Sequence, residues 1–176
     1  MRIFMSVLAT AAALVATGAA AQSCSFRLSE FEAATYDYKA DVSAFSDQLS
    51  TMFARFNDLS AGAQENPESC PAGLEQSRAA AVSLDVDALT ARSDTLLDCA
   101  FFFNGRVLAD IEAARAENDS QLILRLGEVQ KRIFRIDVDV TDATKQAMFL
   151  GFRTQALVSE HDVLNRRCTL LGDIYD

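Results

Sequence analysis

Four cysteines and one histidine carry the most reactive side chains of this sequence, and their spacing limits what they can do. The cysteines are Cys24, Cys70, Cys99 and Cys168. An even number of widely spaced cysteines is typical of disulfide pairs in an oxidising compartment. No two of them form a C-x-x-C motif, so nothing indicates a zinc site, thioredoxin-type redox chemistry or covalently bound haem. We therefore expect two disulfide bonds, no metal and no cofactor.

The single histidine, His161, lies in the segment SEHDV with carboxylates on both sides. A histidine in this setting could act as a general base, sense pH or contact a metal. It also falls on the apolar series of a predicted helix, where a half-buried histidine bonded to a neighbouring helix is the ordinary arrangement. We interpret His161 as structural, with the other three roles as alternatives.

The remaining motif-like segments lack the residues that their chemistry needs. The acids of DVDVTDAT, from Asp137 to Asp142, resemble a calcium loop, but Asp142 stands where the loop needs glycine and Met148 where it needs glutamate. The sequence contains no G-x-S-x-G, Walker A, H-E-x-x-H or glycine-rich nucleotide motif. We expect no catalytic residue and no enzyme activity. A glycosidase that uses only carboxylates is the alternative.

The first residues, MRIFMSVLATAAALVATGAAAQ, are typical of a secretory signal peptide. One basic residue precedes an apolar run from Ile3 to about Thr17, and Ala19 to Ala21 provide the A-x-A cleavage pattern. We predict a signal peptide over residues 1–21 and a single helical domain over 22–176. This predicts a periplasmic or secreted protein with Gram-negative type export and no transmembrane segment. The alternative is a lipoprotein anchored at Cys24, which Gln22 disfavours.

The charge of the chain excludes some partners. The net charge is −9, and removal of residues 1–21, which contain one basic residue and no acid, makes it −10. Because binding to nucleic acid is driven largely by Lys and Arg, we expect no nucleic-acid partner.

Apolar residues recur at alternating gaps of three and four, which is typical of amphipathic helices. The first series runs from 28 to 59, with Ser29 and Glu32 as a capping box. The loop at 60–73 contains both prolines. A second series ends near 117, and either Ser83 or Asp85 could cap it, which would leave 74–82 as a short separate helix.

The third series follows a break at 118–120 and continues to 171, with Gly172 as a natural stop. The segment IDVDVTD at 136–142 has poor helix propensity, so a kink or break there is the alternative to one unbroken helix. We therefore predict an all-α fold, an antiparallel up-down-up bundle of three long helices.

This topology predicts which cysteines pair. Around a turn near 118, facing residues of the last two helices have numbers that sum to about 237, and Cys70 and Cys168 satisfy this. In the first two helices facing numbers sum to about 134, which places Cys99 level with Thr35. Four extended residues reach about 13 Å, enough for Cys24 to fold back to that level. We predict the bonds Cys24–Cys99 and Cys70–Cys168, with the two other pairings as alternatives.

The stretch DCAFFFNGRV places three phenylalanines inside the second helix. Phe101, Phe102 and Phe103 cover about 200° of the helix circumference, so one seam cannot bury all three. One interpretation directs Phe103 to Phe31 and Phe101 or Phe102 to Phe134. In the other, at least one ring is exposed and belongs to a partner-binding patch. A hairpin at Asn104-Gly105 is the third interpretation, which the helical period of the flanks disfavours.

Two features complete the predicted surface. Gly105 would permit close approach of another backbone. The segment MFLGF at 148–152 is apolar on all sides of a helix and raises the same question as the phenylalanine triplet. The candidate interaction surface consists of Phe101, Phe102, Phe149 and Phe152.

These observations predict a non-enzymatic exported helical protein that acts by binding another protein of the cell envelope, as an adaptor, inhibitor or chaperone-like factor. The alternative is a carrier of a small apolar ligand in a phenylalanine-lined interior near Phe31, Tyr38 and Phe103.

Overall fold

A computed structural model of the protein describes residues 24–66 and 70–175, and the side chains up to residue 170. The predicted signal peptide lies outside the described residues. The described part contains helices and no strand. The four helices are α1 (Leu28–Glu65), α2 (Leu74–Val82), α3 (Val86–Ala116) and α4 (Ser120–Tyr175).

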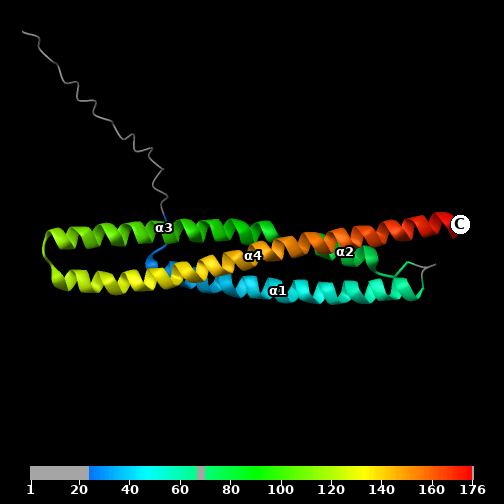
Figure 1. The fold of residues 1–176 in the computed structure, drawn as a ribbon, viewed down its shortest axis with the longest axis horizontal. Coiled ribbons are helices and arrows are strands. Elements are labelled where there is room, and N and C mark those ends of the chain that lie inside the picture. Colours follow the sequence, from blue (N-terminus) through cyan, green and yellow to red (C-terminus); the bar gives the residue numbers. More distant parts are fainter. Residues whose placement is uncertain (1–23, 67–69, 176) are drawn as a thin grey trace, which may run out of the picture.

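Three long helices form the bundle, and α2 is the short separate helix that the sequence allowed for (Figure 1). α4 runs the length of the molecule, with α3 beside its first half and α2 beside its second half. α1 packs against all three other helices. The predicted up-down-up order is confirmed.

Side-chain contacts confirm the predicted register between helices. Phe31 of α1 stacks on Phe103 of α3, and these numbers sum to 134, as predicted. A Cβ added to Gly151 of α4 would lie 3.1 Å from a methyl group of Val86 at the start of α3, and these numbers sum to 237. The two antiparallel pairs therefore hold the predicted alignment at the points where contacts can be named.

The parallel pair, α1 and α4, is aligned by ion pairs. Lys39 Nζ lies 2.9 Å from Asp139 Oδ1, and Arg132 pairs with Glu32. Each pair joins residues that are 100 positions apart in the sequence. A constant offset is the signature of two helices that run in the same direction side by side.

The helix starts differ in part from the prediction. α1 begins at Leu28, where the Glu30 side chain accepts from the backbone N–H of Arg27 at 2.7 Å. The predicted capping box of Ser29 and Glu32 is wrong, because Glu32 is engaged by Arg132 of α4. At α3, Asp85 is the cap, and its Oδ1 accepts from Ala88 N–H at 2.9 Å.

α4 is continuous through 136–142, so the alternative of a break is wrong, whereas the alternative of a kink stays a prediction. Ile136, Val140 and Ala143 are all buried, at helical spacing. Packing of these side chains against α1 and α3 outweighs the weak helix propensity of the segment. The helix also continues past Gly172 to Tyr175, so the predicted stop is wrong.

The turn between α3 and α4 is where the sequence placed it. Asn118 adopts a left-handed conformation with φ of 57°, which asparagine tolerates better than most residues. Asp119 then accepts from the N–H of Leu122 at 2.9 Å at the start of α4.

None of the described helices is long and apolar enough to cross a membrane.

Candidate functional site

The bond between Cys24 and Cys99 is confirmed. Their Cα atoms are 4.8 Å apart and their sulfurs are bonded. The bond joins the segment before α1 to the middle of α3, where the side chain of Cys99 is buried. It therefore fixes the N-terminal segment against the bundle at the level where α1 starts.

Cys70 and Cys168 lie near each other as two free thiols. Cys70 is exposed and Cys168 is buried. Burial, together with the neighbouring Cys70, raises the pKa of the Cys168 thiol to about 11. The predicted bond between them stays a prediction, and a peptide map of the non-reduced protein would detect it. The register that placed these two residues at one level is correct.

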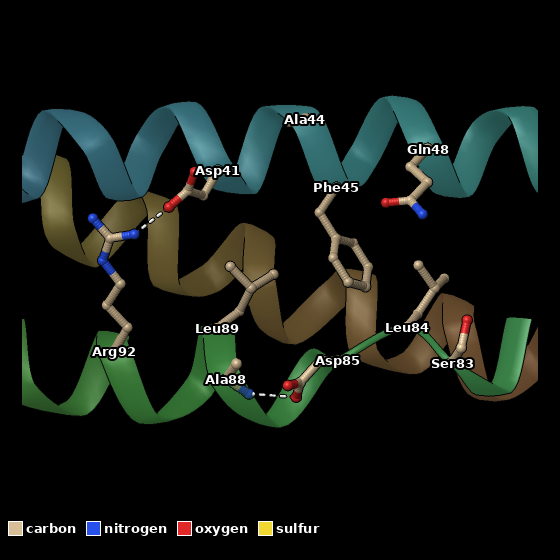
Figure 2. A pocket seen from close by; sticks show the side chains of 10 residues that line it. All are labelled: Asp41, Ala44, Phe45, Gln48, Ser83, Leu84, Asp85, Ala88, Leu89 and Arg92. Atoms are coloured by element: carbon tan, nitrogen blue, oxygen red, sulfur yellow. Dashed lines mark hydrogen bonds and ion pairs between the residues drawn. The ribbon is translucent and has the colours of Figure 1, made fainter. Parts of the chain in front are cut away.

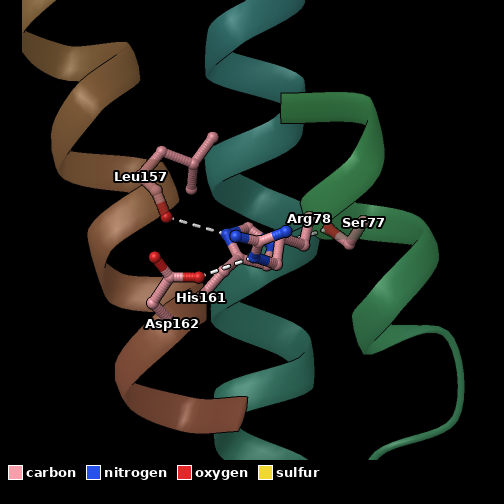
Figure 3. A network of polar contacts seen from close by, with 5 residues as sticks. All are labelled: Ser77, Arg78, Leu157, His161 and Asp162. Atoms are coloured by element: carbon pink, nitrogen blue, oxygen red, sulfur yellow. Dashed lines mark hydrogen bonds and ion pairs between the residues drawn. The ribbon is translucent and has the colours of Figure 1, made fainter. Parts of the chain in front are cut away.

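His161 is buried in a polar network between α4 and α2 (Figure 3). Its Nδ1 lies 2.8 Å from the carbonyl oxygen of Leu157, which can only accept, so Nδ1 carries the proton. Its Nε2 lies 2.9 Å from Ser77 Oγ and accepts from that hydroxyl. The ring of Phe56 covers it from α1 at 4.5 Å.

This arrangement confirms the structural interpretation of His161. Both ring nitrogens are engaged, and the side chain is inaccessible to solvent. Beside it, Arg78 Nε donates to Asp162 Oδ1 at 2.6 Å and makes a second link between α2 and α4. The network holds α2 against the bundle.

Among the described residues, no cluster of three or more His, Cys, Asp or Glu side chains could hold a metal ion.

Phe101 points away from α1 and into solvent. Phe103 stacks on Phe31 with ring centroids 5.5 Å apart, so this side of α3 faces α1. Phe101 lies two residues earlier, about 200° around the helix, and is 75% exposed. Phe102 is half-buried and meets Phe103 edge-on at 5.5 Å.

Phe134 has the corresponding position on α4. Arg132, two residues earlier, reaches Glu32 of α1, so Phe134 also points away from α1. It is 62% exposed. Phe101 and Phe134 have numbers that sum to 235, which puts them at the same level of the α3–α4 pair. We call these two residues the seam patch. The predicted contact of Phe103 with Phe31 is confirmed, and Phe101 is level with Phe134 as predicted, but both of these rings are exposed.

The other two predicted surface residues lie elsewhere. Phe149 and Phe152 are 61% and 65% exposed on α4. The level of Phe101 on α4 is near residue 136, so Phe149 lies about 20 Å further along the helix at 1.5 Å per residue. The four predicted residues are therefore exposed or half-buried, but they do not form one patch. Sequence reasoning missed Phe134, because its exposure depends on which side of α4 faces α1.

A groove of about 390 Å³ lies between α1 and the junction of α2 with α3 (Figure 2). Phe45, Leu84 and Leu89 line it with apolar surface. Its charges are mostly engaged with each other, because Arg92 pairs with Asp41 across the groove and Asp85 caps α3. The groove is open to solvent and presents no free cation to a ligand.

The side chains named for the proposed ligand cavity lie in the core. Phe31 and Tyr38 are inaccessible to solvent, and Phe103 stacks on Phe31. The three side chains that the carrier hypothesis names therefore lie in the buried or partly buried interior, and the hypothesis itself stays a prediction.

Comparisons with models of protein families, with curated protein sequences and with solved structures found no match to this chain.

Proposed function

We propose that this protein is an exported, non-enzymatic binding protein of the cell envelope, which acts as an adaptor, inhibitor or chaperone-like factor through the seam patch. The observation that carries the proposal is the pair of rings, Phe101 and Phe134, exposed at one level of two adjacent helices. Exposed aromatic side chains at one level of two adjacent helices define a candidate interaction site, because such rings gain from burial against a partner.

Two further observations support an exported, non-catalytic role. The Cys24–Cys99 bond uses the sulfur that a lipid anchor at Cys24 would need, and disulfides persist in oxidising compartments. The only histidine is fully engaged inside the bundle. These features favour binding over catalysis and a free protein over a lipoprotein.

A site-specific crosslinking experiment tests the proposal. A photoreactive phenylalanine analogue replaces Phe101 in the full chain, which is then expressed and irradiated in the cells that export it. We expect a crosslink to one defined protein, identified by mass spectrometry. Phe134→Ser in the same chain should reduce that crosslink, because it removes half of the apolar patch.

A matched control separates binding from folding. Val82→Ser changes another exposed apolar side chain, on α2, and should leave the crosslink intact. Both serine variants should melt within a few degrees of the parent chain, because exposed side chains contribute little to stability. A crosslink that is absent, or that Phe134→Ser and Val82→Ser change equally, would contradict the proposal.

A further inference from the structure

The outward face of α4 carries a line of exposed side chains along the helix. Positions seven residues apart lie almost on one line along a helix, because two turns contain about 7.2 residues. Every member of the line that points away from the core is exposed, Val138 least among its large apolar members at 42%. Its members are Leu124, Lys131, Val138, Lys145, Phe152, Ser159 and Arg166.

This line differs in charge from the rest of the molecule. It contains three basic residues and no acid, although the whole chain has a net charge of −9. Exposed Met148, Phe149 and Val163 flank it and widen its apolar surface. Lys131 and Lys145 pair only with exposed acids three residues earlier on the same helix, and Arg166 has no ion pair among the described residues. The face therefore suits an occupant that is acidic and has room for bulky side chains.

The outward face of α1 has this complementary character. Exposed positions opposite its buried face recur at gaps of three and four. They are Ala33, Asp37, Ala40, Ala44, Asp47, Thr51, Ala54, Asp58 and Ala61. The charged members are three aspartates, and none of them has an ion pair within the described part of the chain. The others are small, so that bulky side chains could lie against them.

The spacing of the charges agrees between the two faces. Lys145 and Arg166 are 21 residues apart, and so are Asp37 and Asp58. A separation of 21 residues corresponds to about 32 Å along a helix. Two straight helices laid side by side could therefore form both ion pairs at once, whichever way they run.

From this complementarity we infer that the outward face of α4 binds the outward face of α1 in a second copy of this chain. The two faces cannot meet within one molecule, because α1 and α4 turn their buried sides to the same core and their outward sides away from it. The contact pairs two different surfaces, so it is heterologous and repeats from copy to copy in a ring or a fibre. This inference goes beyond the proposed function and uses other residues than the seam patch.

Sedimentation velocity over a concentration series of the full chain tests the inference. We expect reversible association that weakens with added salt, because charge pairs at a surface are screened. Lys145→Glu with Arg166→Glu should raise the Kd of association by about tenfold or more, because like charges then face each other. Asp37→Lys with Asp58→Lys should do the same from the α1 side.

The decisive sample is an equal mixture of these two double variants. Each variant alone opposes like charges, whereas the mixture restores opposite charges at the contact and should associate like the parent chain. Arg106→Glu with Arg125→Glu is the control, because it makes the same change in net charge at exposed residues off the α4 line. Circular dichroism melts of all variants confirm that they are folded.

Three results would overturn the inference. The parent chain could stay monomeric to millimolar concentration, the control could weaken association as much as the α4 variant, or the mixture could fail to associate. A flotation assay with vesicles that contain phosphatidylglycerol tests the other possible occupant of a basic, apolar face, which is an anionic lipid surface. If the monomer binds these vesicles through Lys145 and Arg166 and does not self-associate, the face serves a lipid surface instead. The crosslinking experiment at Phe101 tests the seam patch and not self-association. Each of the two proposals can therefore fail while the other holds.

Discussion

The hydroxyl group of Tyr38 is the least satisfied polar group in the bundle. It is buried from solvent and has no hydrogen-bond partner in the described structure. Burial raises the pKa of Tyr38, and the nearby hydroxyls of Ser93 and Thr144 oppose this only in part. The hydroxyl oxygen therefore lies buried among α1, α3 and α4. Its burial costs folding free energy, whereas burial of the aromatic ring does not.

Tyr38→Phe should keep or increase stability, by up to about 1 kcal/mol, because it removes a buried polar group that has no bond to lose. Urea unfolding followed by circular dichroism measures the change. Tyr36→Phe is the matched control at an exposed site and should change little. A loss of more than about 1 kcal/mol in Tyr38→Phe would mean that the hydroxyl has a partner, such as a buried water.

The thiol of Cys168 makes stability depend on pH in the reduced protein. Its pKa is about 11 in the folded chain and 9.0 in the ordinary, solvated state. Between pH 9 and 11 the unfolded chain gives up this proton while the folded chain keeps it. The folded state then binds more protons, so the free energy of unfolding should fall as pH rises through this window.

Urea unfolding of the reduced chain from neutral pH to pH 10.5 measures this slope. Cys168→Ser lacks the titrating thiol and provides the reference for all other groups that titrate in the same range. The parent chain should lose stability more steeply than the variant above pH 9. Equal slopes would show that the Cys168 thiol ionises as easily in the folded chain as in the unfolded one.

At the scale of helices, two glycines of α4 differ in what surrounds them. A Cβ added at Gly127 meets no atom within 4 Å, whereas one at Gly151 would lie 3.1 Å from Val86 Cγ1 of α3. Gly127→Ala should stabilise the protein by roughly 0.5–1 kcal/mol, because alanine has the higher helix propensity. Gly151→Ala should gain less than this or lose stability, because Val86 must move.

Thermal unfolding of both alanine variants gives the comparison directly. Gly105→Ala serves as a second open position, because the space around Gly105 is also empty. This emptiness corrects the expectation that Gly105 permits close approach of another backbone. If Gly151→Ala stabilises as much as Gly127→Ala, then the start of α3 is not held against α4 as described.

The features of this fold differ in how clearly the sequence indicates them. Helical period identified the long helices, and the two turns fixed their register closely enough to pair Cys24 with Cys99. Start and stop residues were less reliable, because Glu32 has a tertiary partner, Arg132, that local capping rules do not include. Phe101 was predicted for the surface, but the exposure of Phe134 was not, because the sequence does not say which side of α4 faces α1.

At the scale of the whole molecule, α4 determines the shape. Its 56 residues span about 84 Å at 1.5 Å per residue, and the other helices lie alongside it (Figure 1). An elongated bundle exposes more surface than a sphere of the same mass, and it presents the outward sides of α1 and α4 along its length (Figure 1). The outward line of α4 from Leu124 to Arg166 is unbroken because α4 continues through 136–142.

Small-angle X-ray scattering at low concentration tests this shape. A rod of about 84 Å has a radius of gyration near 25 Å, whereas a compact domain of about 150 residues has one near 15 Å. We expect the larger value for the monomer, and Val140→Pro should lower it by kinking α4 where it is continuous in the parent chain. A parent chain that scatters like a compact domain would mean that α4 folds back on itself, and the outward line from Leu124 to Arg166 would then be interrupted.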